Sequence, residues 1–543
     1  MATTVTASAD VFHQQSPAEE DVMTTDITTN DLGNLSNVMC GLITDKGASK
    51  QLPTEGVSFH ESNIVIVTWD GPDDPRDPFN WPLWKKWWAV GLGLIASFTC
   101  SMNGTILSVA HAAIAEEFGI SDSIFPNPYW MTTSWGVGAA LFPLILFPAM
   151  EDLGVRPVLL GTFFCFMCLL VPIGLAQNFA TLVVIRFFTG GCVPLMSDAV
   201  ASIASNVFQG DKARSAPVSL YVMVYLGATS LGPVIGATIL QFLSWRWIGY
   251  IELIMTAALF PIIFIGLPES RASALLRCKA KKMRHEGGNA LTVEESDPTP
   301  LGRLIMNSLQ RPLYMLFTES VVFIAAIWAA FSLGTIYLFT HSVGQVYREL
   351  YGWDAIQAGY VQSAIVIGEI LGAGLSLLTN HYWYESSAAR NTEIPGTPIP
   401  EARLYAAIIG GFIGIAGGML VYGWAAYSTV HWMAITVGLA MVGFGTTAVV
   451  ISIANYLIDA YAKYAASALA AVGLVENASI AFLPLAASAM YTNIGFQWAS
   501  TLLAFVSLAL VATPFVVVRW GKEIRSRSPF MKEAIIDRQG DLP

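Results

Sequence analysis

Charged residues are scarce in this chain of 543 residues. Asp, Glu, Lys and Arg together make up 12% of it, whereas 54% of it is hydrophobic and its mean hydropathy is +0.55. Soluble globular domains carry about 25% charged residues. The composition therefore excludes an ordinary soluble protein and indicates a membrane protein that crosses the bilayer many times.

The chain also lacks the short motifs of nucleotide, metal and redox chemistry. We find no phosphate-binding glycine loop, no metal-ligand spacing and no catalytic cluster. Cys165 and Cys168 match the CxxC spacing, but they lie in an apolar helix without the strand and turn of a redox site. The other cysteines suggest no disulfide framework. We therefore expect no cofactor, no metal, no ATP-driven step, no enzymatic reaction and no nucleic-acid partner.

The N-terminal segment has neither the apolar core nor the cleavage site of a secretory signal peptide. Residues 1–86 contain 13 acidic and 5 basic residues, a net charge of −8 out of −11 for the whole chain. Such a polar, acidic segment is typical of a disordered tail. We expect targeting to come from the first membrane helix.

Apolar runs divide the rest of the chain regularly. A membrane-crossing helix needs about 20 apolar residues, and twelve runs meet this measure. They lie near 87–109, 129–149, 157–176, 180–203, 217–242, 248–267, 314–339, 359–379, 404–426, 431–457, 466–490 and 496–518. This pattern predicts an all-α membrane protein with two six-helix halves. The predicted parts are the cytoplasmic tail 1–86, the first half 87–267, a basic cytoplasmic linker 268–311, the second half 312–518 and the C-terminal tail 519–543.

The distribution of positive charge supports this count. With both termini in the cytoplasm, only Arg246 and Arg348 of the 28 Lys and Arg residues fall in external loops. Arg186 lies inside a span, and the others face the cytoplasm, as the positive-inside rule requires. An odd number of spans would place many of these basic residues on the external side.

The fifth span has an unusual composition for a helix. It contains Gly227, Gly232, Pro233 and Gly236. Proline inside a helix is tolerated in membranes, because neighbouring helices and local adjustments satisfy the freed backbone groups. The spacing of Gly232 and Gly236 puts both on one face and lets a second helix approach closely. We expect a kinked, tightly packed helix here that takes part in a change of shape.

Several stretches resemble the motifs of one known family. They are 231–236 (LGPVIG) with 244–248 (SWRWI), 182–190 (LVVIRFFTG), 151–157 (EDLGVRP), and 70–75 (DGPDDP) with 80–82 (NWP), 456–461 (YLIDAY) and 467–470 (SALA). Together they resemble the major facilitator superfamily and, within it, the twelve-span drug:proton antiporters of fungi. The likeness departs at Phe147 and Val155, where the loop motif has a glycine and a basic residue, and at Thr189, where the fourth-helix motif has Gln.

This resemblance implies roles for some residues. Gly227, Gly232, Pro233 and Gly236 correspond to the antiporter motif, which would be a seam that keeps the cavity from leaking protons. Glu151, Gly154 and Arg156 correspond to the loop that forms the cytoplasmic gate. We also interpret Asp211 and Arg214, between the fourth and fifth spans, as a gate pair, although signalling of topology explains Arg214 equally well.

Ionisable residues inside a span are costly and usually functional. Arg186 cannot lose its proton, so it needs a carboxylate, a carbonyl or an anionic ligand as its partner. We expect a role in proton coupling or substrate contact, and the alternative is a structural pin between helices. Glu252, just after the Trp245–Trp247 turn, is interpreted as an interfacial partner of Arg246, with both tryptophans in an interfacial belt.

The second half contributes three acidic residues within its spans, Glu319, Glu369 and Glu476, and Asn477 follows the last of them. Burial favours the protonated form of a carboxyl group, so such residues can load and release protons. We expect Glu369 or Glu476 to carry the coupled proton, with Glu319 closer to the interface. Structural ion pairing is the alternative for all three.

These observations predict a monomeric secondary transporter in which two halves rock around a central site. The expected reaction is export of a small organic compound driven by protons, at the plasma membrane or at an internal membrane. The resemblance alone implies drugs, toxins or secondary metabolites. A carrier for uptake on the same fold, and a membrane sensor that transports nothing, remain the alternatives.

Overall fold

The computed structural model describes residues 65–120, 129–296, 301–391 and 396–533. Most of the tail that we predict to be disordered lies outside these residues. Twelve helices of the described part are long and apolar enough to cross a membrane, so the predicted number of spans is confirmed.

The first half follows a short 3-10 turn, η1 (Pro78–Asn80). Its helices are α2 (Leu83–Ile106), η2 (Leu107–Ala110), α3 (His111–Phe118), α4 (Trp130–Leu153), α5 (Val155–Gly174), α6 (Phe179–Val207), α7 (Asp211–Phe242) and α8 (Arg246–Gly266). The first span is longer than predicted, because α2, η2 and α3 continue one another from Leu83 to Phe118.

The second half contains two spans that are not purely α-helical. Its elements are α12 (Ser320–Tyr351), α13 (Ala355–Val361), α14 (Ser363–Thr379), the π-helix η3 (Asn380–Tyr384), α15 (Glu385–Ser387), η4 (Ala388–Arg390), η5 (Pro400–Leu404), α16 (Tyr405–Ile409), the π-helix η6 (Gly410–Gly417), α17 (Gly418–Trp424), α18 (Trp432–Tyr461), η7 (Ala462–Tyr464), α19 (Ala465–Ile494) and α20 (Phe496–Arg527). Helix α20 extends well past the predicted end of the last span, residue 518.

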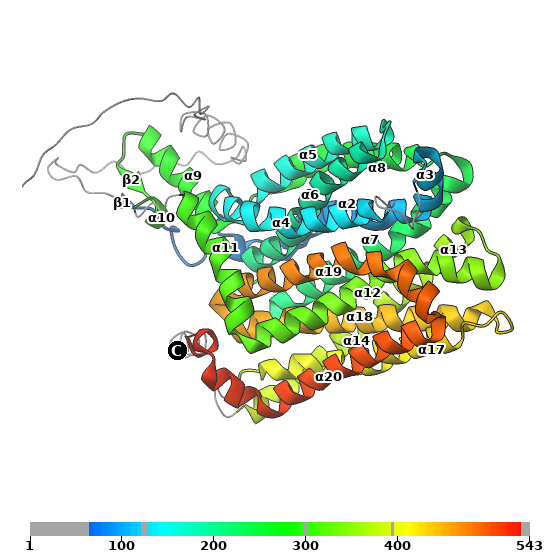
Figure 1. Ribbon diagram of the computed structural model, residues 1–543. Coiled ribbons are helices and arrows are strands. Elements are labelled where there is room, and N and C mark those ends of the chain that lie inside the picture. Colours follow the sequence, from blue (N-terminus) through cyan, green and yellow to red (C-terminus); the bar gives the residue numbers. More distant parts are fainter. Residues whose placement is uncertain (1–64, 121–128, 297–300, 392–395, 534–543) are drawn as a thin grey trace, which may run out of the picture. The chain divides into compact units, whose positions relative to one another are not determined.

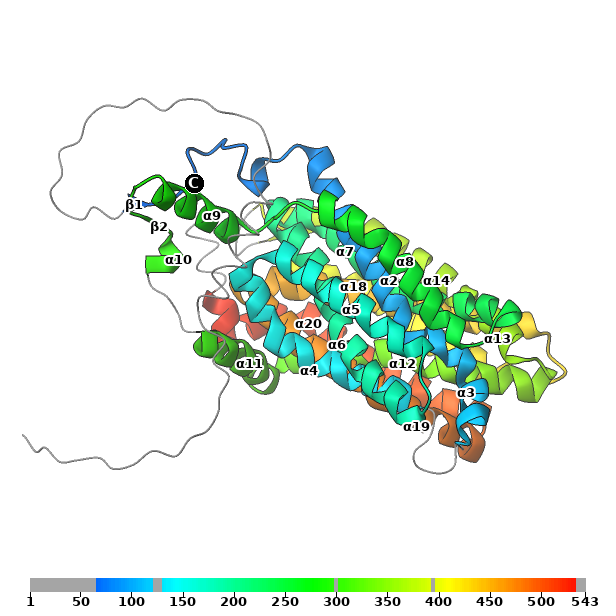
Figure 2. The ribbon, with the colours of Figure 1, turned by 90° about the horizontal axis from the view of Figure 1, so that it is seen from above.

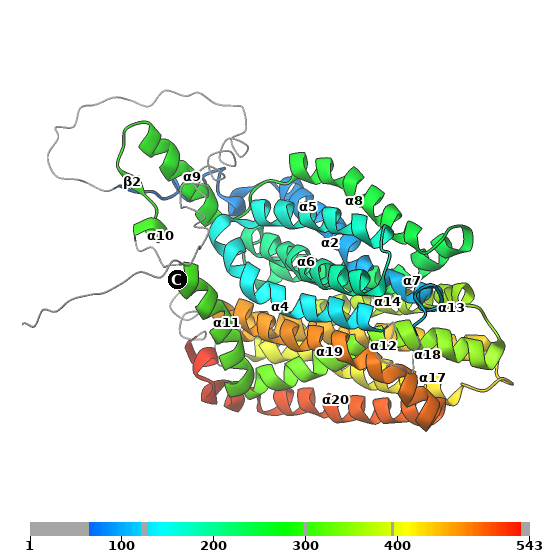
Figure 3. The same cartoon turned by 45° about the horizontal axis from the view of Figure 1, so that its top comes forward.

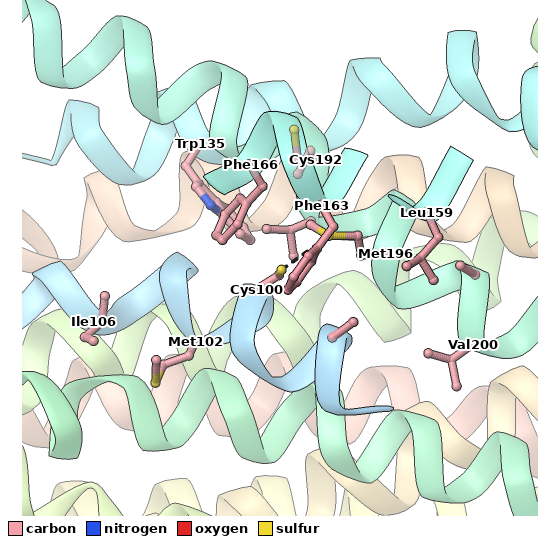
Figure 4. Packing of buried hydrophobic residues seen from close by; sticks show 14 of the residues in the cluster. Cys100, Met102, Ile106, Trp135, Leu159, Phe163, Phe166, Cys192, Met196 and Val200 are labelled. Atoms are coloured by element: carbon pink, nitrogen blue, oxygen red, sulfur yellow. Dashed lines mark hydrogen bonds between the residues drawn. The ribbon is translucent and has the colours of Figure 1, made fainter. Parts of the chain in front are cut away.

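Two large hydrophobic clusters account for most of the buried side chains. One is formed mainly by the first half but includes Leu333, Tyr337 and Ile480 of the second, and the other is formed by the second half. The halves meet where α4 packs on α19 and where α7 packs on α14, α13 and α18. Figures 1 and 3 show α4 beside α19 from two directions. In the first half, Cys100 Sγ contacts Met196 Sδ at 3.3 Å (Figure 4).

The linker contains secondary structure of its own: α9 (Ala272–His285), β2 (Ala290–Leu291), α10 (Val293–Ser296) and α11 (Leu301–Thr318). These elements gather at one end of the helices (Figure 2), which we call the linker end. Strand β1 (Val65–Ile66) pairs with β2 in parallel, and Lys279 Nζ lies 2.5 Å from Asp70 Oδ1. The segment before the first span is therefore fastened to the linker.

The sequence suggests no disulfide framework, and one cysteine of the described residues departs from that expectation. Cys100, Cys165, Cys168 and Cys192 are free. Cys278 in α9 is instead disulfide-bonded.

The Asp74 side chain fixes the conformation of the proline-rich stretch before η1. Its carboxylate accepts hydrogen bonds from the backbone N–H groups of Asp70 and Arg76, at 3.1 and 2.9 Å, and from the Arg76 guanidinium. Burial would raise the pKa of Asp74, but the hydrogen bonds from Arg76 and Asp70 outweigh it and lower the pKa from 3.8 to about 2. The ionised carboxyl therefore stabilises this segment above pH 3.8, and the contribution is lost as the pH falls through about 2.

We predict that Asp74→Ala lowers the free energy of unfolding by about 1 kcal/mol, because two N–H groups and a guanidinium lose their acceptor. Thermal unfolding of the detergent-purified protein at pH 7 measures the change. Asp73→Ala is the matched control, because Asp73 is exposed and no shift in its stability is expected. Equal effects of the two substitutions would contradict the assignment.

Candidate functional site

The Arg186 side chain is buried in the first half, with 1% of its surface exposed. Helix α6 directs it towards α2, where Nη1 donates to the Asn103 carbonyl at 2.6 Å and Nη2 donates to the Gly104 carbonyl at 2.8 Å. The guanidinium carbon also lies 5.8 Å from the centre of the Trp135 ring. Backbone carbonyls and an aromatic face thus surround a permanent positive charge.

Asn103 connects this charge to a carboxylate. Its Oδ1 accepts from Arg186 Nη1 at 2.8 Å and from Trp135 Nε1 at 3.2 Å, while its Nδ2 donates to Glu252 Oε2 at 2.9 Å. Glu252 is fully buried, and its Oε1 has no hydrogen-bond partner among the described residues. One amide therefore joins α2, α4, α6 and α8.

This position of Glu252 corrects the interpretation from sequence. Arg246 pairs instead with Glu117, with 2.7 Å between Nη1 and Oε1. The physical reason is helical geometry: six residues of a helix correspond to about 600°, so the two side chains point in different directions. The tryptophans also separate, since Trp247 is 42% exposed whereas Trp245 is 4% exposed and donates to Glu117. Only Trp247 has the exposure of an interfacial anchor.

Glu369 lies at the contact between the two halves. The carboxyl group comes from α14 and is completely buried, and its Oε1 accepts from Ser230 Oγ of α7 at 2.7 Å. Its Oε2 has no hydrogen-bond partner among the described residues. This oxygen faces Gly227, where a Cβ atom would lie 3.9 Å away. The small residue therefore leaves room for the carboxyl group.

Glu476 and Asn477 lie on α19 and are both half-buried. Asn477 donates to the Gly473 carbonyl of its own helix at 2.8 Å. The Glu476 carboxyl interacts electrostatically with Asp198 of α6 and with Tyr221 and Tyr225 of α7. Glu476 therefore faces the first half, as a residue of a central site should.

Glu319 is separate from this group. It is the residue that precedes α12 at the linker end, and it is almost entirely buried. Its Oε2 accepts from Tyr461 OH at 3.1 Å. The position at the end of the span agrees with the sequence, but the side chain is enclosed by protein.

The glycines of the fifth span face two different neighbours. Gly232 and Gly236 lie against α2, and a Cβ atom on Gly232 would come within 2.9 Å of the Met102 carbonyl oxygen. The close approach expected from their spacing is thus present, but within the first half. Helix α7 contains Pro233 without interruption, and the Pro233 carbonyl faces Gly359 of the second half.

The loop between α4 and α5 is held by a residue that we did not predict. Gly154 ends α4 with a φ of 102°, and Glu269 accepts from the N–H groups of Val155 and Arg156 at 3.2 and 3.0 Å. A carboxylate at the N-terminus of a helix stabilises it. Burial raises the pKa of Glu269, and these backbone N–H groups oppose that rise. The loop is thereby tied to the end of α8.

The structure gives fewer contacts for the remaining residues of the predicted gate. The Arg156 guanidinium donates to the Phe264 carbonyl at 3.0 Å, and Arg214 is half-buried near the start of α7. The side chains of Glu151 and Asp211 lie outside the described part of the chain. The predicted pairing of Asp211 with Arg214 stays a prediction.

A buried network at the linker end joins the two halves. Arg403 Nε donates to Asp459 Oδ2 at 2.8 Å, and Arg403 Nη1 donates to Ser215 Oγ of α7 at 2.9 Å. Tyr384 OH also donates to Asp459 at 2.8 Å, and Asn380 Nδ2 donates to Ser215 Oγ at 3.3 Å. We call these residues the linker-end latch, because Ser215 belongs to the first half and the others belong to the second.

Polar contacts also join the halves at the opposite end. Thr132 Oγ1 lies 3.0 Å from His341 Nε2, and Tyr360 OH donates to Gln241 Oε1 at 3.0 Å. The predicted residues Arg186, Glu369 and Glu476 lie between these contacts and the latch along their helices.

The sequence did not single out Asn103, Asp198 or Arg403. Asn103 and Asp198 are polar residues within apolar runs, so the cost of burying them was a usable signal. Arg403 lies at the edge of a span, where a basic residue has the simple explanation of topology. Only the packing of the helices distinguishes it from the other Lys and Arg residues that lie outside the spans.

We predict that Asn103→Leu lowers the free energy of unfolding by about 3 kcal/mol, because Arg186, Trp135 and Glu252 all lose a partner in a buried site. Thr99→Val is the matched control on the same helix, because its hydroxyl donates only to the Ile95 carbonyl, at 2.9 Å. Thermal unfolding of the purified proteins measures both. One hydrogen bond has a net value of about 1 kcal/mol. A loss of stability smaller than about 1 kcal/mol for Asn103→Leu would therefore contradict the assignment of Asn103 as the residue that joins four helices.

Comparison with known proteins agrees with this architecture. Residues 93–383 match the family model described as Major Facilitator Superfamily. The chain is 30% identical over 93% of its length to the major facilitator superfamily multidrug transporter FLU1 of Candida albicans, covering 83% of that protein. It is also 30% identical to efflux pump atB of Aspergillus terreus, over 86% of this chain and 90% of that one.

A solved structure shares the fold at lower identity. The crystal structure of the human organic anion transporter MFSD10 (TETRAN) superposes with a TM-score of 0.58 at 16% identity, over 81% of this chain and all of that one. Twelve membrane-spanning helices, the matching family model and the relatives lead to one conclusion. The chain belongs to the major facilitator superfamily, and it is a multi-pass membrane transporter of small organic solutes and not an enzyme.

Proposed function

We propose that the protein exports drugs, toxins or secondary metabolites in exchange for protons that enter the cell. The direction is supported by the Gly-Pro motif of α7 and by a relative named as an efflux pump. The range of compounds is supported by a relative named as a multidrug transporter. We place the protein in the plasma membrane as a monomer.

The observation that carries proton coupling is the contact between Glu369 and Ser230. A single hydrogen bond of 2.7 Å joins a fully buried carboxyl group of one half to a hydroxyl group of the other. A protonated carboxyl group is stable in such a place, whereas a carboxylate without a cation is costly to bury. Loss of the proton therefore favours separation of α14 from α7, and gain of a proton favours their contact.

The remaining site residues have supporting roles in this proposal. Arg186 holds α2 against α6 and sets the charge around Asn103 and Glu252. Glu476, with Asn477 beside it, is the second candidate for proton or substrate binding. Glu319 fixes the start of α12 through Tyr461.

Alternating access needs gates at both ends. At the linker end we assign this role to the latch and to the α4–α5 loop, with Glu151, Gly154 and Arg156 in the loop and Asp211 and Arg214 at the start of α7. Gly227, Gly232, Pro233 and Gly236 let α7 pack closely on α2 and α14 while the halves move.

We predict that Glu369→Gln uncouples export from the proton gradient. Gln keeps the size of the side chain and a hydrogen-bond acceptor for Ser230, but it cannot release a proton at neutral pH. Export of a fluorescent drug from proteoliposomes, with and without a pH gradient, measures the effect. We expect the gradient to accelerate the wild-type protein at least 10-fold more than the variant, which corresponds to about 1.4 kcal/mol of coupling.

The control is Glu349→Gln, at an exposed glutamate near the C-terminal end of α12. This variant should respond to the gradient as the wild-type protein does. Proton-coupled export is ruled out if transport by the wild-type protein is unchanged when the gradient is collapsed. Full coupling in Glu369→Gln would instead move the role to Glu476.

A further inference from the structure

Tyr337 belongs to the second half of the protein but is buried among residues of the first. Its helix, α12, packs on η2 and α7 of the first half, and its side chain has no exposed surface. Tyr337 and Leu333, one turn earlier on α12, belong to the hydrophobic cluster that the first half mainly forms. A large side chain of one half is therefore inserted into the other, near the middle of α12.

The inserted side chain ends against two residues, Gly104 of α2 and Trp135 of α4. The centres of the Tyr337 and Trp135 rings are 6.0 Å apart. A Cβ atom on Gly104 would lie 2.8 Å from Tyr337 Oη and 3.0 Å from Trp135 Cζ2. Real Cβ atoms essentially never come closer than 3.0 Å to another heavy atom, so a glycine is needed here to leave room for the Tyr337 hydroxyl group.

Both residues that Tyr337 contacts belong to the network around Arg186. The Gly104 carbonyl accepts from Arg186 Nη2 at 2.8 Å. Trp135 Nε1 donates at 3.2 Å to Asn103 Oδ1, and the same oxygen accepts from Arg186. A displacement of Gly104 or Trp135 therefore moves a group on which the buried charge depends.

The contact of Tyr337 is steric and not polar. Its hydroxyl group makes no hydrogen bond to the described residues. A buried hydroxyl group without a partner is costly, so hydrogen bonding does not stabilise this contact. The side chain is held by its fit beside Gly104 and can leave without breaking a hydrogen bond, as a contact between two moving halves requires.

We propose that Tyr337 is a positioning residue for transport. It seats the second half on Gly104 and Trp135 and thereby fixes the Arg186 network. While Tyr337 occupies the space beside Gly104, Trp135 is held against Asn103. When the halves part, Tyr337 leaves, and the indole and the amide gain freedom to turn. This proposal rests on the alternating access proposed above and not on proton coupling.

Cross-linking one helical turn away reports whether the halves touch at this place. Thr132 lies one turn before Trp135 on α4 and His341 one turn after Tyr337 on α12, with 3.0 Å between Thr132 Oγ1 and His341 Nε2. Because cysteine is shorter than histidine, a short bifunctional thiol reagent should bridge the pair in full-length Thr132→Cys/His341→Cys in detergent. Mass spectrometry of the joined peptides gives the rate, and Thr132→Cys alone is the blank.

We expect Gly104→Ala to slow this cross-linking at least about 2-fold, because its methyl group overlaps the Tyr337 hydroxyl group and such overpacking favours parted halves. Adding Tyr337→Phe removes only the overlapping oxygen and should restore most of the rate. Gly91→Ala is the matched control on α2, because a Cβ atom there meets nothing within 4 Å. Adding Tyr347→Phe instead should restore nothing, because that hydroxyl group lies 2.8 Å from Thr436 Oγ1 within the second half.

A fluorine label reports on Trp135 itself. In protein labelled with fluorotryptophan, the fluorine NMR resonance that disappears in Trp135→Phe belongs to Trp135. Tyr337→Leu removes the ring that faces this indole and should move the resonance, whereas Tyr347→Phe should leave it in place. Thermal unfolding confirms that each variant is folded, and the cross-linking rate decides alone if Trp135→Phe does not fold.

The proposal is overturned if the wild-type pair does not cross-link or if folded Gly104→Ala cross-links as fast as Gly91→Ala. It is equally overturned if Tyr337→Phe does not restore the rate, or if the Trp135 resonance stays in place in folded Tyr337→Leu. Neither measurement needs a solute or a pH gradient. Rescue by Tyr337→Phe together with transport that ignores the gradient would therefore support the positioning role and reject proton exchange.

Discussion

The first half of the protein is built around a positive charge that cannot be removed. Arg186 is buried at a depth where water is not available, and its guanidinium keeps its proton under all conditions. Four helices meet at Asn103 because its amide is both an acceptor for this charge and a donor to Glu252. Removing any one partner would leave the others unsatisfied, so these helices are expected to move as one body.

The contact between the halves is different at the level of α7 and α14. There the buried Glu369 carboxyl group has Ser230 as its hydrogen-bond partner and no arginine or lysine beside it among the described residues. In the proposed function its charge is variable, because a proton can balance it. The arginine that joins the halves, Arg403, lies instead in the latch at the linker end.

The span count, the two halves and the position of Arg186 inside a span followed from the sequence, because apolar length and intramembrane charge are local properties of the chain. The partners of these residues did not. Glu252 was assigned to Arg246, since nearness in sequence suggested it, whereas the rotation of α8 turns it towards Asn103. The partners of Asp198 and Arg403 depend on which helices become neighbours, and a single sequence does not encode that in any short pattern.

The pairing of β1 with β2 has a further consequence for the first half. Residues 65 and 290 are adjacent in space, so the chain between them, which includes all six helices of that half, forms a ring closed by a few backbone hydrogen bonds. Closing so long a loop costs conformational entropy, which these hydrogen bonds and the contact of Lys279 with Asp70 offset in the folded state. The first half therefore carries its own fastening, and the tail enters the molecule at the same place where the chain leaves for the second half.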